Sequence, residues 1–364
     1  MKSISKDILF KRQTTLPEIG KEGQKRLQQA KVLVVGCGGL GSPVAVYLAS
    51  SGVGIIHLVD FDKVMAANLH RQIFYSLEDI GKYKSKVLAS FIRQRAPYTE
   101  VSFSTEVLTK SNAIELISNV DIVVDGTDSL PTKYLLNDVC VLQNKPLVYG
   151  SLYKFDGYVS TFNVAQGKGR YSANLRDAFP EMNVAVPNCE EAGTLNAIVG
   201  MIATAQVNEV LKIITKTGKP LVNELLIYNA QQNTQLKMKL TPGVPKEKIA
   251  AIFKTQTYFD PTCGNRNPDW QISPEELKEI LADTRRSQQV NLIAVLSDLK
   301  LPFSVHQTIP IREFDANTLE VDFEKTYVMV CQRGLNSYKA MVQLKEKYPG
   351  LNVLNLTGGI SAYL

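Results

Sequence analysis

Short apolar runs alternate with longer segments of helical periodicity along the first 150 residues. The predicted strands span residues 32–35, 54–59, 101–104, 121–125 and 146–149. The predicted helices span residues 22–29, 44–50, 84–95, 113–119 and 131–143. Strands covered on both faces are continuous apolar runs, and strands that alternate with helices form a parallel sheet. The pattern therefore predicts an α/β fold with a doubly wound, Rossmann-like, mostly parallel sheet.

The pattern changes after Gly150. Residues 157–164 alternate between apolar and polar positions, which is typical of a strand in an antiparallel pair. The remaining predicted features are a polar, irregular stretch over residues 166–188, a long helix over 195–215 and a hairpin over 225–228 and 235–240. We expect these segments to complete a first domain that spans residues 1–240.

Prolines mark a linker over residues 241–271. A second, smaller α/β domain is predicted over residues 272–364. Its predicted strands span residues 290–296, 327–330 and 352–356, and its predicted helices begin at Pro274 and Ser337. Ser273 and Pro274 have the order expected of a helix N-cap followed by its first residue.

The composition is ordinary for a globular protein. The chain has 364 residues, of which 45% are hydrophobic and 21% charged, and its formal net charge is +6. This charge is mild, and there is no arginine-rich run, so we expect no nucleic acid partner. Apolar runs fall short of a membrane span and the N-terminus has no signal core, so we expect no membrane partner and a cytoplasmic location.

The five cysteines are scattered and no two have Cys-x-x-Cys spacing, while histidine occurs three times. This pattern disfavours a disulfide framework and a structural zinc site.

A glycine turn follows the first predicted strand. Residues 36–41 read Gly-Cys-Gly-Gly-Leu-Gly, a helix follows, and the next strand ends in Asp60. Glycine permits the tight turn, Gly38 and Gly39 let backbone N–H groups approach phosphate, and the helix N-terminus favours an anion. An acid about twenty residues on hydrogen-bonds a ribose hydroxyl. The alternative is a glycine turn without a ligand.

Charged residues follow the carboxyl ends of the other strands, where ligands bind in open α/β sheets. Arg71 and Lys84 suit a triphosphate, and Asp128 suits Mg²⁺, which needs one or two carboxylates besides phosphate oxygens. Taken singly, each residue fits a solvated surface charge, a turn or a helix cap equally well.

Five motifs occur in the order and spacing of the MoeB/ThiF enzymes, which are prokaryotic relatives of ubiquitin-activating enzymes. They are the glycine turn, residues 60–62 (Asp-Phe-Asp), residues 68–72 (Asn-Leu-His-Arg-Gln), residues 81–84 (Gly-Lys-Tyr-Lys) and residues 125–129 (Asp-Gly-Thr-Asp-Ser). The resemblance covers about residues 8–240. It implies a homodimer that uses MgATP to adenylate the C-terminal Gly-Gly carboxylate of a ubiquitin-like sulfur-carrier protein.

The resemblance also implies roles for single residues. Asp60 would bind the ribose, Asp128 would hold Mg²⁺, and Arg71 and Lys84 would act on the phosphates. The full set implied for the nucleotide site is Arg12 from the partner subunit of the dimer, Gly38, Gly39, Asp60, Asp62, Asn68, Arg71, Gln72, Lys84, Asp128 and Ser129.

Residues 187–193 (Pro-Asn-Cys-Glu-Glu-Ala-Gly) resemble the cysteine motif of the family. Cys189 precedes a helix, whose N-terminus favours a thiolate, and is a candidate for thioester or acyl-disulfide chemistry; a small buried residue is the alternative. The chain departs from the family at the two Cys-x-x-Cys pairs that bind zinc in many members. The first region reads Tyr171-Ser172-Ala173-Asn174 and the second has no pair. We expect no structural zinc.

The predicted second domain resembles a rhodanese domain, as found fused to MoeB-type enzymes. Residues 331–337 (Cys-Gln-Arg-Gly-Leu-Asn-Ser) follow a buried strand and precede a helix, so the loop can direct N–H groups at a Cys331 thiolate or persulfide. A cysteine that simply ends a strand is the alternative. The usual early Asp-Val-Arg is here Ala294-Val295-Leu296, so the domain is divergent.

These features together predict an adenylyltransferase with sulfurtransferase activity, supplied by a persulfide donor such as a cysteine desulfurase. The product would be a carrier thiocarboxylate for molybdopterin, thiamine or another sulfur-containing compound. Two alternatives stay open, an NAD-dependent dehydrogenase and a non-catalytic scaffold that binds a ubiquitin-fold protein. Arg71, Lys84 and Asp128 have no function near a nicotinamide, and five intact motifs fit a scaffold poorly.

Overall fold

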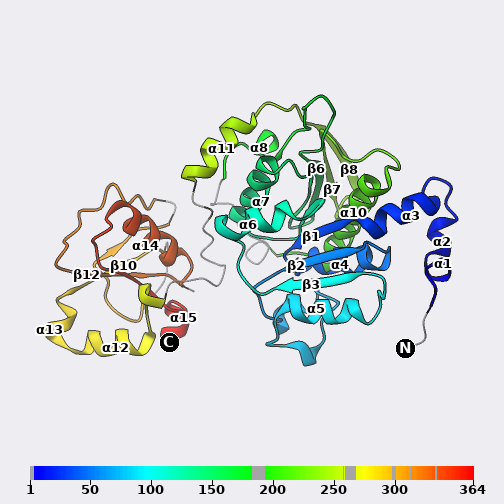
Figure 1. Ribbon diagram of the computed structural model, residues 1–364. Helices are drawn as coiled ribbons and strands as arrows, with labels where there is room; N and C mark the ends of the chain where they lie inside the picture. The colour runs from blue at the N-terminus through cyan, green and yellow to red at the C-terminus, as the bar shows by residue number, and fades with distance from the viewer. Residues whose placement is uncertain are drawn as a thin grey trace. The chain divides into compact units, whose positions relative to one another are not determined.

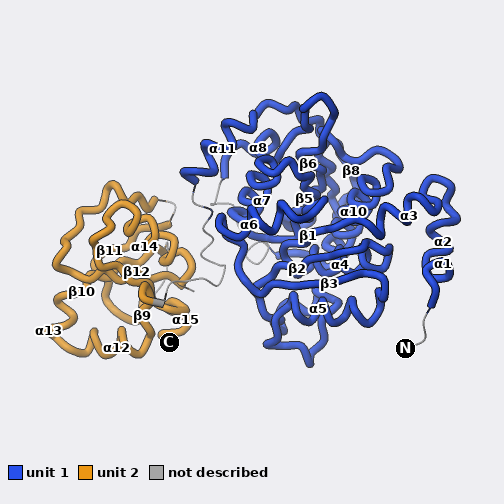
Figure 2. Tube along the Cα trace, in the orientation of Figure 1, with its two compact units in different colours: residues 1–260 blue, residues 261–364 orange. Residues whose placement is uncertain are grey.

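The computed structural model describes residues 4–182, 193–256, 258, 268–296, 301–311, 313–332 and 334–364. The chain divides into two compact units, residues 1–260 and 261–364, which are coloured separately in Figure 2.

The first unit combines an N-terminal group of short helices with one large sheet (Figure 1). Its strands are β1 (Lys31–Val35), β2 (Ile55–Val59), β3 (Glu100–Ser104), β4 (Ile122–Asp125), β5 (Leu147–Tyr153), β6 (Asp156–Phe162), β7 (Glu224–Asn229) and β8 (Thr234–Lys239). Its helices are α1 (Lys6–Leu9), α2 (Lys11–Thr14), α3 (Gly20–Gln29), α4 (Gly41–Ser50), α5 (Lys84–Arg93), α6 (Lys110–Ser118), α7 (Leu130–Leu142), α8 (Leu175–Ala178), α10 (Asn196–Thr215) and α11 (Lys246–Thr255), with 3₁₀ turns η1 (Ala66–Asn68) and η2 (Leu77–Asp79).

The strand order is β3-β2-β1-β4-β5-β6-β7-β8. The first five strands in this order are parallel to their neighbours, and β6, β7 and β8 continue the sheet in antiparallel pairs. The order reverses between β1 and β4, so this is the topological switch point at which open α/β sheets bind ligands. The predicted doubly wound, mostly parallel fold is confirmed.

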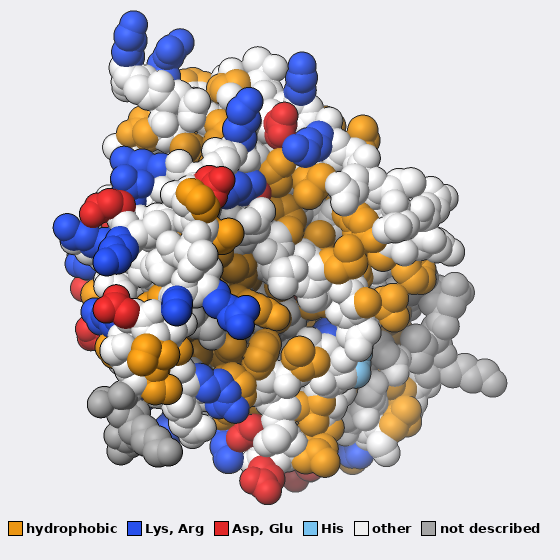
Figure 3. Space-filling view, turned by 90° about the vertical axis from the view of Figure 1, so that its right-hand side faces the viewer, with side chains coloured by type: hydrophobic (Ala, Val, Ile, Leu, Met, Phe, Trp, Pro, Cys, Tyr) orange, Lys and Arg blue, Asp and Glu red, His pale blue; other side chains and the backbone are white. Residues whose placement is uncertain are grey.

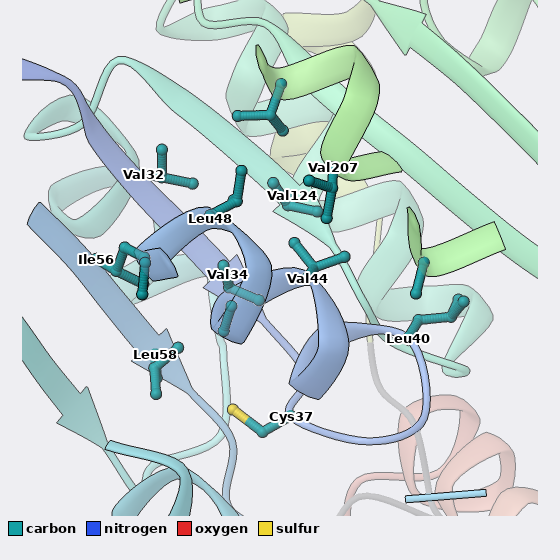
Figure 4. Close-up of a cluster of buried hydrophobic side chains, with 14 of the residues drawn as sticks. Val32, Val34, Cys37, Leu40, Val44, Leu48, Ile56, Leu58, Val124 and Val207 are labelled. Atoms are coloured by element: carbon teal, nitrogen blue, oxygen red, sulfur yellow. The ribbon is translucent and has the colours of Figure 1, made fainter. Parts of the chain in front are cut away.

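Both faces of the sheet are buried at its central strands β1 and β4, which explains the continuous apolar runs there. Val32 and Val34 of β1 pack into a cluster with α4, α5 and α10, and Figure 4 shows part of it around Val44 and Leu48. Leu33 and Val35 of β1 pack on the opposite face with α6 and α7. Because successive side chains of a strand point to opposite faces, one apolar run serves both clusters.

Helix α10 is the one helix, among the described residues, that is long and apolar enough to span a membrane by length and composition. The sequence predicts this helix over residues 195–215, but the expectation that apolar runs fall short of a membrane span does not hold for its length and composition. Half of that stretch is buried inside the protein, where the helix packs against α4, β5 and β6. These contacts are those of a core helix, although its other half leaves an apolar surface.

Two elements lie in segments predicted to be irregular. Helix α8 lies within residues 166–188, and α11 lies within the predicted linker and packs against α7. Helix α8 has only four residues, and α11 has no side-chain cap at its N-terminus. Packing against α7 therefore stabilises both helices more than their own helix propensity does. Part of the segment 241–271 therefore belongs to the first unit.

The second unit is a smaller α/β structure. Its elements are η3 (Pro268–Trp270), β9 (Gln271–Ile272), α12 (Pro274–Ala282), α13 (Thr284–Ser287), β10 (Val290–Ala294), β11 (Gln307–Thr308), β12 (Thr326–Val330), α14 (Asn336–Lys347), β13 (Val353–Leu356) and α15 (Ile360–Tyr363). The strands form one parallel sheet in the order β11-β10-β12-β13-β9. Ser273 caps α12 through the N–H of Glu276, as the sequence predicts.

Candidate active sites

The glycine turn between β1 and α4 is packed backbone against backbone. A Cβ atom added to Gly41 would lie 1.7 Å from the carbonyl oxygen of Gly36, and one added to Gly126 would lie 2.7 Å from the Cα of Gly41. Gly36 has a φ of +84°, which favours glycine. The turn after β1 and the turn after β4 are therefore in direct contact at the switch point.

Asp60, at the end of β2, is bound to this turn. One carboxyl oxygen accepts the Cys37 N–H at 2.6 Å, and the other accepts the Asp62 N–H at 2.7 Å. Burial raises the pKa of Asp60 to about 6, against the opposing effects of the Lys84 charge and the two N–H groups. The carboxyl group thus lies beside the glycine turn as the sequence predicts, in surroundings where its charge is costly.

Lys84, the first residue of α5, is buried, and its ammonium group lies 2.8 Å from an oxygen of the half-exposed Asp62 side chain. Burial alone would lower the pKa of Lys84, but the charges of Asp60 and Asp62, with a smaller effect of Asp128, outweigh it and raise the pKa. One protonated amine therefore lies in the field of three carboxylates that come from separate loops.

The segment after η1 brings polar side chains to the same turn. Asn68 and Gln72 are buried, and the Asn68 carbonyl accepts the backbone N–H groups of Arg71 and Gln72. A Cβ atom added to Gly38 would meet Gln72 Nε2 at 3.4 Å, and Gln72 Oε1 is buried without a hydrogen-bond partner among the described residues. Arg71 is partly buried, with Nη1 2.9 Å from His70 Nε2.

The turn after β4 is held by a buried ion pair. Asp125 Oδ1 accepts the Thr127 N–H and hydroxyl, and Asp125 Oδ2 lies 2.9 Å from Lys133 Nζ. Lys133 also donates to the Gly150 carbonyl in the middle of β5. Asp128 itself is exposed. The ion pair thus holds the start of the turn in place, while the Asp128 carboxylate remains accessible to a ligand.

In the second unit, Cys331 directly follows β12 and is buried. The Cys331 carbonyl accepts the Ile360 N–H, and a Cβ atom added to Gly359 would lie 2.3 Å from that carbonyl oxygen. The loop after β12 therefore packs directly on the glycine pair at 358–359. The hydrogen bond that the described residues give to Sγ comes from Ser337 Oγ at 3.2 Å; the predicted set of N–H donors stays a prediction.

Comparison with known proteins identifies the family. The ThiF family model matches residues 10–248. The chain belongs to the ThiF family. It is 33% identical to the probable adenylyltransferase/sulfurtransferase MoeZ of Mycobacterium tuberculosis, over 97% of this chain and 92% of that protein. It is 40% identical to the sulfur carrier protein adenylyltransferase of Thermus thermophilus, over 71% of this chain and 96% of that one. Among solved structures, Escherichia coli MccB has a similar fold, with a TM-score of 0.58, 22% identity and coverage of 66% and 74% of the two chains.

The residues at the switch point of this ThiF-family chain fit ATP, which the family uses. Gln72 Oε1 is an unpaired buried acceptor, the Asp60 carboxylate lies beside the turn, and Lys84 is cationic. The structure brings Gly38, Asp60, Asp62, Gln72 and Lys84 together around the glycine turn, in agreement with their grouping in the sequence.

Other predicted site residues of the ThiF-family unit are placed differently. Ser129 caps α7, because its hydroxyl accepts the Thr132 N–H at 3.2 Å, so its local role is structural. Arg12 is exposed on α2, beside Lys11 and Thr15. Its neighbour Gln13 anchors the arm through the Ser51 carbonyl. Cys189 lies outside the described residues.

Sequence reasoning missed two buried polar residues that hold Asp125 in place. Lys133 lies on the apolar face of α7, and Gln206 of α10 donates to the backbone carbonyl of Asp125 at 2.8 Å. A lysine or glutamine at a buried position of an apolar helix is the signal that would have identified them, since such polar groups need partners.

Polar contacts hold the segment in which the family's first zinc-binding pair would occur. Asp177 Oδ1 accepts the N–H groups of Gly243 and Val244, and Asp177 Oδ2 accepts the N–H and side-chain amide of Asn174. A single carboxylate therefore links α8 to the segment before α11.

A second buried ion pair fixes the end of α8. Asp138 of α7 accepts two hydrogen bonds from Arg176, at 2.8 and 2.6 Å, and one from the Tyr258 hydroxyl. Tyr134, whose ring lies 4.8 Å from the Arg176 guanidinium, donates to the Phe179 carbonyl. The chain is therefore anchored just before residues 183–192 and again just after α11.

Proposed function

We propose that this chain uses ATP to adenylate the C-terminal carboxylate of a ubiquitin-like sulfur-carrier protein and then converts it to a thiocarboxylate. The observation that carries the proposal is the grouping of Lys84 with Asp60, Asp62 and Asp128 at the switch point of the sheet. Relatives that align along 97% of the chain are named adenylyltransferase/sulfurtransferase, and another is named for a sulfur carrier protein.

The adenylation site uses charge to bring two anions together. Arg71, Lys84 and Asn68 would hold the phosphates, and Asp60 would accept a ribose hydroxyl. Lys84 would leave Asp62 for phosphate, which an exposed carboxylate permits at small cost. Asp128 would hold Mg²⁺, which when bound neutralises phosphate charge and stabilises the pyrophosphate leaving group. Together these charges lower the repulsion that the incoming carboxylate meets.

The sulfur step is assigned to Cys331. Its persulfide, loaded by a donor such as a cysteine desulfurase, attacks the acyl-adenylate carbonyl, and AMP leaves as an acyl disulfide forms. A thiolate, with Cys189 as the candidate, then attacks Cys331 Sγ. This releases the thiocarboxylate and leaves a Cys189–Cys331 disulfide, which a cellular dithiol must reduce to two thiols.

Assembly as a homodimer is part of the proposal. Figure 3 shows hydrophobic side chains gathered in a hollow on one face of the protein, with lysines and arginines beside it. Met201, Ile202 and Leu226 line a cavity of about 330 Å³, and Tyr47 is 51% exposed. A second copy would cover this apolar surface and bring its Arg12 to the ATP. An active monomer in light scattering would contradict the dimer.

We also propose that the protein needs no structural zinc. Asp177 already links the segments near residues 174 and 243, so a metal is not required to hold them. Elemental analysis of the purified protein should detect no zinc. One zinc per chain would contradict this part of the proposal.

The two alternatives predict different products. A dehydrogenase would oxidise or reduce a nicotinamide, and a scaffold would bind a carrier without changing its mass. The decisive experiment incubates the protein with a Gly-Gly carrier, MgATP and a persulfide donor and measures the intact mass of the carrier. We expect the adenylate without donor and the thiocarboxylate with it. The Asp128→Ala variant should give neither, whereas an unchanged carrier with the parent protein would refute the proposal.

A further inference from the structure

In the sulfur site, one serine hydroxyl lies within hydrogen-bond distance of two acceptors. Ser337, the second residue of α14, is fully buried, and its Oγ lies 3.2 Å from Cys331 Sγ and 2.6 Å from Asn355 Oδ1. A serine hydroxyl has a single proton to donate. Ser337 can therefore donate either to the sulfur or to the Asn355 oxygen, and the two compete.

Asn355 has a second contact, on the side away from Ser337. Asn355 lies in β13 between β12 and β9, and its Nδ2 donates to Gln271 Oε1 at 3.0 Å. Gln271 Oε1 also lies 3.2 Å from the Thr357 hydroxyl, which donates to it. In this arrangement the amide nitrogen of Asn355 points to Gln271 and its oxygen points to Ser337.

The arrangement treats the thiol and the thiolate differently. In the thiol form, Cys331 S–H can donate to Ser337 Oγ while Ser337 donates to Asn355, so each group is satisfied. In the thiolate form, the sulfur gains a hydrogen bond when Ser337 turns its proton to it. The buried Asn355 oxygen then loses its donor, which is unfavourable.

We propose that Asn355 restrains the reactivity of Cys331 by competing for the proton of Ser337. Asn355 is thus a positioning residue that acts through Ser337 and favours the unreactive thiol until sulfur is to be loaded. The inference rests on the proposed function of Cys331 as the sulfur carrier. It assigns a role to the interior of β13, away from the loop that the substrate would reach.

The test measures alkylation of Cys331 by iodoacetamide at pH 7.5 in the full chain, followed by mass spectrometry of the peptide that contains Cys331. Asn355→Leu removes the competing oxygen at similar volume, so we expect alkylation about tenfold faster, as for a thiolate that gains a hydrogen bond. Ser337→Ala removes the donor and should slow it by a similar factor. The double variant should behave like Ser337→Ala, because Asn355 acts only through Ser337.

Two further variants keep the test decisive. Asn355→Asp places a stronger acceptor at the same position and should slow alkylation, which separates competition from loosened packing. Thr357→Val removes a hydroxyl one step further along the network and should leave the rate unchanged. Slower alkylation in Asn355→Leu, or independent effects of the two changes in the double variant, would overturn the inference.

The proposed function fails in a different way. If Cys331→Ala still yields thiocarboxylate, Cys331 is not the sulfur carrier, whatever the alkylation rates show. If Cys331→Ala blocks thiocarboxylate but Asn355→Leu and Ser337→Ala both slow alkylation, the carrier role stands and the competition does not.

Discussion

The Asp60 carboxyl group is buried where its negative charge is costly. A pKa of about 6 in the folded protein, against about 4 in the unfolded chain, means that the folded state binds more protons between these values. The contribution of Asp60 to stability therefore decreases as the pH rises from about 4 to about 6. A site that holds a charge at such a cost is typical of function rather than of packing.

Asp60→Asn should separate stability from activity. The amide keeps an oxygen for one of the two N–H groups but has no charge to bury. We expect the variant to gain stability relative to the parent protein at pH 7 and to gain less at pH 4, as measured by urea denaturation. Its carrier-dependent ATP–pyrophosphate exchange should fall. A stability difference that is the same at both pH values would contradict the assigned ionisation.

At the scale of single elements, α7 positions the turn that carries Asp128. The buried Lys133–Asp125 pair connects α7 to the end of β4, and Lys133 reaches the Gly150 carbonyl of β5 as well. Removing one partner of a buried ion pair leaves an uncompensated charge, whereas removing both does not.

Lys133→Met should lower the free energy of unfolding by about 3 kcal/mol, the usual scale for an isolated buried charge. ATP–pyrophosphate exchange should fall as well, because Asp125 is no longer held by Lys133 and the turn at Thr127 is less well positioned. The double variant Asp125→Asn/Lys133→Met should recover most of the stability in urea denaturation. If it is no more stable than Lys133→Met, the ion pair is not what holds the turn.

The Asp177 contacts connect α8 to the segment before α11, and their removal should have a measurable cost. Asp177→Ala removes the acceptor of the Gly243 and Val244 N–H groups, which lie at or near the surface, so we expect a loss of about 1 kcal/mol of stability. Asp177→Asn, which keeps an oxygen, is the matched control and should lose less. Equal losses in thermal unfolding would show that the oxygen is not responsible.

The elements around the nucleotide site were predictable because each signal was local. The apolar run at β1, the glycine turn and Asp60 lie within thirty residues of one another. Helix α11 was missed because its stability comes from packing on α7, and Lys133 and Gln206 were missed because their partners lie far away in the sequence. The Ser337–Asn355 contact joins residues 18 positions apart, and no periodicity indicates it.

At the scale of the whole molecule, the two proposed reactions use separate compact units. The adenylation residues lie in the first unit and Cys331 lies in the second, and the division falls between residues 260 and 261. Each unit has its own sheet and its own core. The two reactions should therefore be separable by mutation.

Cys331→Ala should leave ATP–pyrophosphate exchange close to the parent rate and stop thiocarboxylate formation from a persulfide donor, because alanine cannot carry sulfur. Exchange assays and the intact mass of the carrier measure the two steps on the same preparation. Thr357→Val, in the same unit, is the control that should retain both. Loss of exchange in Cys331→Ala would show that the units do not act independently.

The close packing of the glycine turn also determines which mutations laboratory evolution would accept. Every side chain at position 41 collides with the main chain at position 36, so selection for folding alone would retain Gly41. At position 38 an added methyl group meets only the end of the flexible Gln72 side chain, at 3.4 Å. A library selected for solubility should therefore drift at position 38 while position 41 stays invariant. If the same library is selected in cells whose growth requires the enzyme to supply the sulfur-containing product, both glycines should be retained.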